Sequence, residues 1–178
     1  LTIGGGSWKG NAGKYFINCE YITMSGGVIY NSNSHFNLCH YANISGGVFI
    51  GSTNDAIYGN YVTISDVLCV GNRQGLNYSH GGIISGGIFA GNLTAVSNCL
   101  GVSISGGTFY GNGTVTTSGP VFISGGTFSN NTTAISSLEL YVSGGTFTSN
   151  TRDLLTSAGK LNNVTLTSGT EHSSYTSL

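Results

Sequence analysis

The chain has 178 residues, of which only five are Lys or Arg and six are Asp or Glu, with a formal net charge of −1. Nucleic acids and anionic membrane surfaces are bound by clustered Lys and Arg, and these five cations are scattered, so we expect neither partner. No apolar run approaches the ~20 residues that cross a bilayer, so we also expect no membrane insertion by this segment. Thirty Gly without a three-residue period, and a single Pro, exclude collagen.

A pattern close to I-S-G-G-x-F-x-G-N recurs eight times, as far as Asn150, in steps of 19 to 21 residues. The anchor positions of the copies are Gly4, Ser25, Ser45, Ser65, Ser85, Ser105, Ser124 and Ser143. A repeat this short and regular indicates a solenoid, in which each repeat forms one coil and buries its apolar face against its neighbours.

One central repeat illustrates the expected elements in chain order. Val102 and Ile104 alternate with polar residues, which predicts a half-buried strand. Gly106 and the glycine after it then permit the positive φ that a sharp corner requires. A second short strand is expected at 108–110 and a weaker third one around Val115, before the next coil begins.

Stacking the repeats places like residues above one another in columns. The apolar column before the anchor contains Ile3, Met24, Ile44, Ile64, Ile84, Ile104, Ile123 and Val142. The column four residues after it contains Trp8, Ile29, Phe49, Cys69, Phe89, Phe109, Phe128 and Phe147. A looser column contains Phe16, Phe36, Ile57, Leu76, Val96, Val115, Ile135 and Leu154. Because burial of each large side chain contributes roughly 1.5–3 kcal/mol, these columns can hold a chain rich in Gly and Ser together.

Two polar columns mark corners of the coil. One contains Asn11, Ser32, Ser52, Asn72, Asn92, Asn112, Asn131 and Asn150. Stacked amides can hydrogen-bond along the rod, so we expect an asparagine ladder whose role is structural. The anchor serines are expected to form a second polar ladder.

The G-G-x-F step runs directly into an F-x-x-N motif in four successive repeats, at Phe89–Asn92, Phe109–Asn112, Phe128–Asn131 and Phe147–Asn150. This resembles the GGA(I/L/V) and FxxN repeats of chlamydial polymorphic outer-membrane proteins and related autotransporter adhesins. It is more loosely similar to the pectin-lyase-like superfamily. The two motifs overlap at the Phe here, which departs from that pattern. The resemblance implies a right-handed, extracellular solenoid with an adhesive or structural role, and it assigns no catalytic residue.

The predicted fold is therefore all-β: a single-stranded right-handed parallel β-helix (β-solenoid) of eight to nine coils of about 20 residues, with three short strands per coil. We expect it to span residues 1–170. Residues 171–178 have lost the columns and are expected to be a C-terminal cap or linker tail.

Catalytic and metal sites are not predicted. A glycosidase needs paired carboxylates, but Asp55 and Asp66 lie on different corners of adjacent coils, and Asp153 has no carboxylate in its column. His40 and His80 share a slot with Glu20 and Asn60, which favours a Glu20–His40 contact over a metal site, because a third ligand is lacking. We therefore expect no enzyme activity, no metal and no cofactor.

The cysteines offer two interpretations. Cys19 and Cys39 occupy one slot on successive coils, within the Cα separation that a disulfide accepts, and Cys99 recurs there. Facing side chains in parallel strands rarely reach the torsion of a disulfide, so buried free thiols acting as apolar fillers are favoured.

Outward columns carry the candidate binding residues. Tyr21, Tyr41 and Tyr61 form an aromatic ladder that is either self-packing or a platform for sugar rings. A second outward face begins as an apolar strip, typical of a contact surface, made of Val28, Tyr30, Val48, Ile50, Leu68 and Val70. It continues as a Thr and Ser array, as at Thr146 and Thr148, which resembles the ice-binding faces of antifreeze proteins.

These features lead to one leading hypothesis and three alternatives. The leading hypothesis is a non-enzymatic structural or adhesive module on the outside of a cell or virion, a stalk, fibre or adhesin. Its expected partners are another copy of itself, laterally or end to end, or a surface glycan. The alternatives are a glycan-binding module acting through the tyrosines, an ice-binding solenoid, and a tail-spike-like polysaccharide depolymerase.

Overall fold

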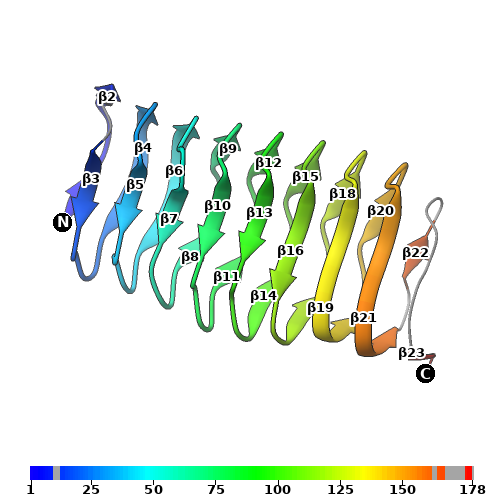
Figure 1. Cartoon of the computed structure of the whole chain (residues 1–178). Coiled ribbons are helices and arrows are strands. Elements are labelled where there is room, and N and C mark those ends of the chain that lie inside the picture. The colour runs from blue at the N-terminus through cyan, green and yellow to red at the C-terminus, as the bar shows by residue number, and fades with distance from the viewer. Residues whose placement is uncertain (10–12, 162–163, 167–174, 178) are drawn as a thin grey trace.

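The computed structural model describes residues 1–9, 13–161, 164–166 and 175–177. Figure 1 shows a rod in which the chain winds in successive coils from the N-terminal to the C-terminal end. Every pairing between the described strands is parallel, and the described residues contain no helix. The protein is thus an all-β parallel β-solenoid of about eight turns, which confirms the predicted fold class.

Each turn contributes to three faces. Strands of the first face are β1 (Thr2–Ile3), the start of β4 (Thr23–Tyr30), the start of β6 (Asn43–Ile50), β8 (Thr63–Ile64), β11 (Ile83–Ile84), β14 (Val102–Ile104), β17 (Val121–Ile123), the end of β19 (Thr133–Val142), the end of β21 (Arg152–Leu161) and β23 (Tyr175–Ser177). Strands of the second face are β2 (Ser7–Lys9), the ends of β4 and β6, β9 (Leu68–Val70), β12 (Ile88–Ala90), β15 (Thr108–Tyr110), β18 (Thr127–Ser129), β20 (Thr146–Thr148) and β22 (Thr165–Leu166). Strands of the third face are β3 (Lys14–Ile17), β5 (Ser34–Asn37), β7 (Asp55–Tyr58), β10 (Gln74–Asn77), β13 (Thr94–Ser97), β16 (Thr114–Ser118) and the starts of β19 and β21.

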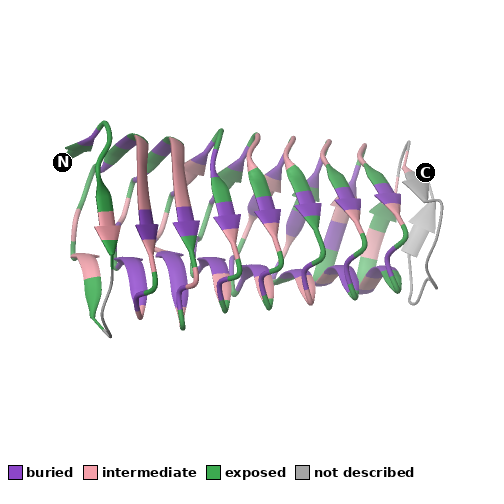
Figure 2. Cartoon of the chain, turned by 90° about the horizontal axis from the view of Figure 1, so that it is seen from above, coloured by how far each residue is buried: buried purple, intermediate pink, exposed green. Residues whose placement is uncertain are grey.

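The core is the lumen of the rod, as the repeat columns predict. Figure 2 shows buried residues recurring at equivalent positions in successive turns. Phe89 pairs with Phe109, which pairs with Phe128, and the ring centroids of these pairs are 5.1 and 4.9 Å apart. All three rings are fully buried. Stacked like side chains therefore fill the lumen along the axis.

One column of the third face differs from its prediction. The register pairs Val96 with Thr116 and Thr116 with Ile135, so Thr116, not Val115, occupies this slot. Val115 is nevertheless buried, one position earlier. Adjacent positions are both buried in β16, so hydrophobicity alone selected the valine, while the Oγ1 hydroxyl of Thr116 donates to Ser136 O at 3.3 Å.

The two glycines after the anchor serine have distinct structural reasons. A Cβ on Gly106 would lie 2.3 Å from Ser85 O in the preceding turn, so only glycine allows the turns to approach this closely. Gly107 has φ +99°, a conformation that other residues rarely adopt. Together they form the corner between the first and second faces.

The asparagine ladder is present in the structure. The Nδ2 of Asn112 donates to Asn131 Oδ1 at 3.0 Å and to Phe89 O at 2.9 Å, and the backbone N of Asn112 also donates to Asn131 Oδ1. The same pattern links Asn72, Asn92, Asn112, Asn131 and Asn150, all of them buried. Asn11 lies outside the described residues. The anchor hydroxyls of Ser45, Ser85 and Ser143 donate to backbone carbonyls of the preceding turn.

At the C-terminal end, Tyr175–Ser177 pair with Gly159–Leu161 and so continue the first face. These three residues fall in the stretch where a cap or linker tail is expected. Residues 167–174 and 178 lie outside the described part of the chain.

Candidate functional site

The tyrosine ladder lies on the edge between the third and first faces. The Tyr21 and Tyr41 ring centroids are 5.2 Å apart at 12°, and those of Tyr41 and Tyr61 are 5.1 Å apart at 8°. These side chains are 68%, 47% and 53% exposed, respectively. Three near-parallel rings therefore present a flat, solvent-facing platform along the axis.

The backbone at the ladder is strained. Tyr21, Tyr41 and Tyr61 have φ of 54°, 54° and 56°. The left-handed conformation costs roughly 1–2 kcal/mol per non-glycine residue, hence about 3–6 kcal/mol for three tyrosines. Two stacked ring pairs return about 1–3 kcal/mol beyond the apolar area that they bury. The strain therefore offsets much of the stacking gain, and the tyrosines occupy these positions at a cost to the backbone that glycine avoids.

The next two turns show what the backbone alone requires. Gly81 and Gly101 follow the tyrosines along this edge, with φ of +67° and +72°. Glycine adopts this conformation without a steric cost. A Cβ on Gly81 would also lie 3.2 Å from a ring carbon of Tyr61, so the absence of a side chain gives the last ring of the ladder its space.

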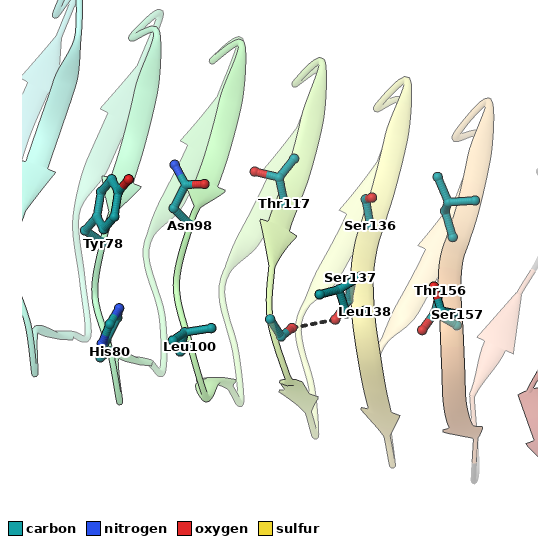
Figure 3. A pocket seen from close by; sticks show the side chains of 12 residues that line it. Tyr78, His80, Asn98, Leu100, Thr117, Ser136, Ser137, Leu138, Thr156 and Ser157 are labelled. Atoms are coloured by element: carbon teal, nitrogen blue, oxygen red, sulfur yellow. Dashed lines mark hydrogen bonds between the residues drawn. The ribbon is translucent and has the colours of Figure 1, made fainter.

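A groove continues from the end of the ladder along the same edge. Tyr61 N donates to the carbonyl of His80 at 3.1 Å, and His80 lines the groove. The groove has a volume of about 790 Å³ and runs past the C-terminal ends of β10 and β13 and over β16, β19 and β21. Figure 3 shows two rows of side chains along it: Tyr78, Asn98, Thr117 and Ser136 in one, and His80, Leu100 and Leu138 in the other.

The groove is lined mainly by apolar side chains and by side chains that carry hydroxyl groups. Tyr78, Leu100 and Leu138 are exposed apolar side chains, and Thr117 supplies a hydroxyl that lies 3.1 Å from Ser97 Oγ. None of the lining residues is Lys, Arg, Asp or Glu. An uncharged, elongated ligand suits such a surface better than an ionic one.

Sequence reasoning missed this groove because its residues do not form one column. Tyr78 and Asn98 share a left-handed corner position, with φ of 54° and 50°, but the turn that carries Gly119 is one residue shorter. The positive φ values of Tyr78 and Asn98 place their side chains outward at the corner. Sequence periodicity does not reveal that geometry.

The apolar strip lies on a different face from the ladder. Val28 and Tyr30 on β4, Val48 and Ile50 on β6, and Leu68 and Val70 on β9 pair in register across the second face. Ile50 and Leu68 are each 37% exposed, and the other four side chains are half-buried. The structure therefore brings the three tyrosines together and the six strip residues together, on separate sides of the rod.

The carboxylates that were considered for catalysis lie apart. Asp55 is buried on β7, where its Oδ1 accepts from Asn77 Nδ2 at 2.7 Å and its Oδ2 from Asn54 Nδ2 at 3.0 Å. Burial raises the pKa of Asp55, while the Asn77 hydrogen bond and the charges of Arg73 and Lys14 lower it. Asp66 is exposed at the corner between the first and second faces.

The histidine column has the predicted alignment with a different contact. Glu20 and His40 form a backbone bridge, as their shared slot predicts. The Nδ1 atom of His40 accepts from Asn60 N at 2.9 Å, and His80 N donates to Asn60 Oδ1 at 3.2 Å. In this column, the side chains of His40 and Asn60 therefore each accept a hydrogen bond from a backbone N–H of the next turn.

All four cysteines are free thiols, and Cys39, Cys69 and Cys99 are buried, which agrees with their interpretation as apolar fillers. Burial raises the pKa of Cys69 and of Cys99 to about 12, and that of Cys39 to about 11. These thiols therefore stay protonated at neutral pH, whereas nucleophiles and metal ligands are thiolates.

Within the described ranges, no group of three or more His, Cys, Asp or Glu side chains is arranged to hold a metal ion. In the same part of the chain, none of the elements is a helix long and apolar enough for a membrane span. Comparison of the chain with protein-family models, with curated proteins and with solved structures found no match.

Proposed function

We propose that this protein is a non-enzymatic, extracellular adhesive solenoid that binds a linear glycan along the edge formed by the tyrosine ladder and the groove. The observation that carries the proposal is the stack of three exposed tyrosines in the left-handed conformation. Its backbone strain offsets much of its stacking energy, and strained backbone of this kind clusters at ligand sites.

The geometry suits a sugar polymer. An exposed phenol ring offers a flat apolar surface for the C–H face of a pyranose and a hydroxyl for hydrogen bonds. Successive rings follow the turn spacing of about 4.8 Å, similar to the advance of one sugar unit in an extended glycan. Beyond Tyr61 the groove offers hydroxyl and apolar side chains in the same direction, so a long chain can continue past the ladder.

The test is a triple variant, Tyr21→Gly with Tyr41→Gly and Tyr61→Gly, compared with the wild type on a glycan array. Glycine already fills this edge position in two turns, at Gly81 and Gly101. Relief of strain is expected to offset the lost stacking, so the free energy of unfolding stays within about 2 kcal/mol of the wild type or rises. Binding to linear glycans is expected to disappear.

Tyr110→Ser is the matched control, because Tyr110 is an exposed tyrosine on the second face and pairs in register with Ser129. It should leave the glycan profile unchanged. A triple variant that retains the wild-type profile removes the ladder as a binding site. A large loss of stability in that variant would instead assign the tyrosines a structural role.

A further inference from the structure

A second pair of stacked aromatic rings lies on the first face, further along the rod. The ring centroids of Phe122 on β17 and Tyr141 on β19 are 5.0 Å apart at 8°. They line a hollow of about 320 Å³ together with Ser103, Ser124, Ser143 and Lys160. Phe122 is 43% exposed and Tyr141 is half-buried, and both line the hollow.

Charged groups flank the Tyr141 ring on two sides. The phenol of Tyr141 donates a hydrogen bond to Glu139 Oε1, and this bond raises the pKa of Tyr141. The phenol therefore stays protonated and holds its ring toward Glu139. Lys160 pairs in register with Tyr141 on the following turn and lines the hollow, so it brings a positive charge to that side of the site.

We propose that this hollow binds a carboxylated pyranose, a unit of an acidic polysaccharide. The apolar face of the sugar lies on Phe122 and Tyr141, its hydroxyl groups meet the serine side chains, and its carboxylate lies at Lys160 Nζ. The carboxylate of Glu139 repels an anion, which sets the direction of the sugar: its charged end points toward Lys160.

The hollow lies close enough to the tyrosine ladder for one sugar chain to contact both. In this respect the inference rests on the proposed function. Tyr61 directly precedes β8, and the first face then runs through β11 and β14 to β17, where Phe122 lies. Three turns of about 4.8 Å separate the two platforms by about 14 Å along the axis. Ile83 and Ser103 face outward between them, so a chain that leaves Tyr61 over the first face, instead of along the groove, contacts both platforms.

The experiment is NMR titration of the ¹⁵N-labelled protein with methyl β-glucuronide and, separately, methyl β-glucoside, which differ only in the carboxylate. The glucuronide is expected to shift the amides around Phe122, Tyr141 and Lys160 more strongly than the glucoside. Both sugars are expected to shift those around Tyr21, Tyr41 and Tyr61. Acetate serves as a carboxylate without a sugar ring.

Two substitutions separate the ring contacts from the charge contact. Phe122→Ser copies Ser103, its partner in the preceding turn, and is expected to weaken glucuronide binding at the hollow about tenfold. Lys160→Gln is expected to weaken it about fivefold and leave glucoside binding unchanged. Tyr110→Ser is expected to change neither.

Each outcome decides one of the two proposals. Equal shifts with both sugars at the hollow, or shifts with acetate as large as with the glucuronide, overturn the assignment to an acidic sugar. No response at the hollow while the ladder responds overturns this inference and leaves the proposed function standing. A response at the hollow with a silent ladder overturns the proposed function and supports the acidic-sugar site.

Discussion

At the residue scale, two features of this chain oppose the stability of the solenoid. The first is the left-handed tyrosines, whose strain marks a candidate binding edge. The second is His35 on β5, which is fully buried with no hydrogen bond of normal geometry at either ring nitrogen. Its ring lies against Phe49, with centroids 5.8 Å apart. A buried, unpaired polar side chain costs stability and makes that stability depend on pH.

His35 predicts acid sensitivity. Burial lowers its pKa to about 4 from an ordinary value of 6.5, and the backbone of Ile50 offsets this only in part. The folded protein holds His35 in its neutral form, so His35 causes no loss of stability above pH 6.5. As pH falls from 6.5 toward 4, the unfolded chain takes up a proton that the folded chain rejects. The expected loss is about 3 kcal/mol in the free energy of unfolding.

The measurement is urea denaturation at pH 7 and pH 4.5 for the wild type and for His35→Ala, since Ala56 fills the equivalent slot of the next turn. The difference in the free energy of unfolding between pH 7 and pH 4.5 should be much smaller in His35→Ala than in the wild type. The exposed His80→Ala is the control and should keep it. The raised pKa of Asp55 acts in the opposite direction in all three proteins, so the comparison between them isolates His35. A wild type equally stable at both pH values contradicts the prediction.

At the element scale, stability depends on the corners as much as on the strands. The strands are short, and consecutive faces meet at positions where the backbone must turn sharply. The glycine pair holds one corner and the asparagine ladder another. In the ladder, side-chain amides replace the strand pairing that the backbone interrupts there.

Asn112→Ala is therefore expected to destabilise the protein by about 3 kcal/mol. The substitution leaves Phe89 O without the amide donor and Asn92 N without its acceptor, and Asn92 Nδ2 keeps only Cys69 O as an acceptor. Each buried polar group without a partner costs about 1–3 kcal/mol. Equilibrium unfolding in urea, followed by circular dichroism, measures the change. Asn130→Gly is the control, because Asn130 is exposed with φ 54°, and an equal loss in both variants would contradict a specific role of the ladder.

The elements were predictable from the sequence wherever one residue type recurs at a fixed period. The phenylalanine column and the asparagine ladder both arise from repetition, and both are present. The third face was less readable because β16 buries adjacent positions, so Val115 and Thr116 compete for one slot. Of the candidate sites, the stacking of Tyr41 between its neighbours followed from the period. Its backbone strain did not follow, nor did the pairing of Phe122 with Tyr141, because dihedral angles and unlike partners leave no periodic signal.

At the scale of the whole molecule, the second face has Lys9 on β2 and no other charged side chain on the described strands through β20. From β4 to β20 its outward residues are apolar or hydroxyl-bearing, and Leu68 and Ile88 are 37% and 47% exposed. We infer that the apolar strip from Val28 to Val70 packs against the same strip of a second copy, because both surfaces are uncharged and have the same strand spacing. Apolar patches of this kind mark contact surfaces.

Leu68→Glu is expected to shift the protein toward the monomer, because two facing carboxylates would be buried without partners. Light scattering coupled to size exclusion, over a range of protein concentrations, measures this. Thr127→Glu is the matched control in the same column, outside the apolar strip, and should leave the association unchanged. A wild type that stays monomeric at high concentration removes self-association from consideration.

Because the asparagine ladder repeats the same hydrogen bonds in each turn, the rod can be shortened by one whole turn without a new kind of junction. Asn92 and Asn112 make the same contacts one turn apart, so excision of residues 93–112 would join Asn92 to Gly113 and re-create the original junction. Tyr61 and Phe122 would then stand one pitch closer, while the groove would lose Asn98 and Leu100 and the hollow would lose Ser103. The number of turns between the two aromatic platforms therefore sets the distance between them, in steps of one winding.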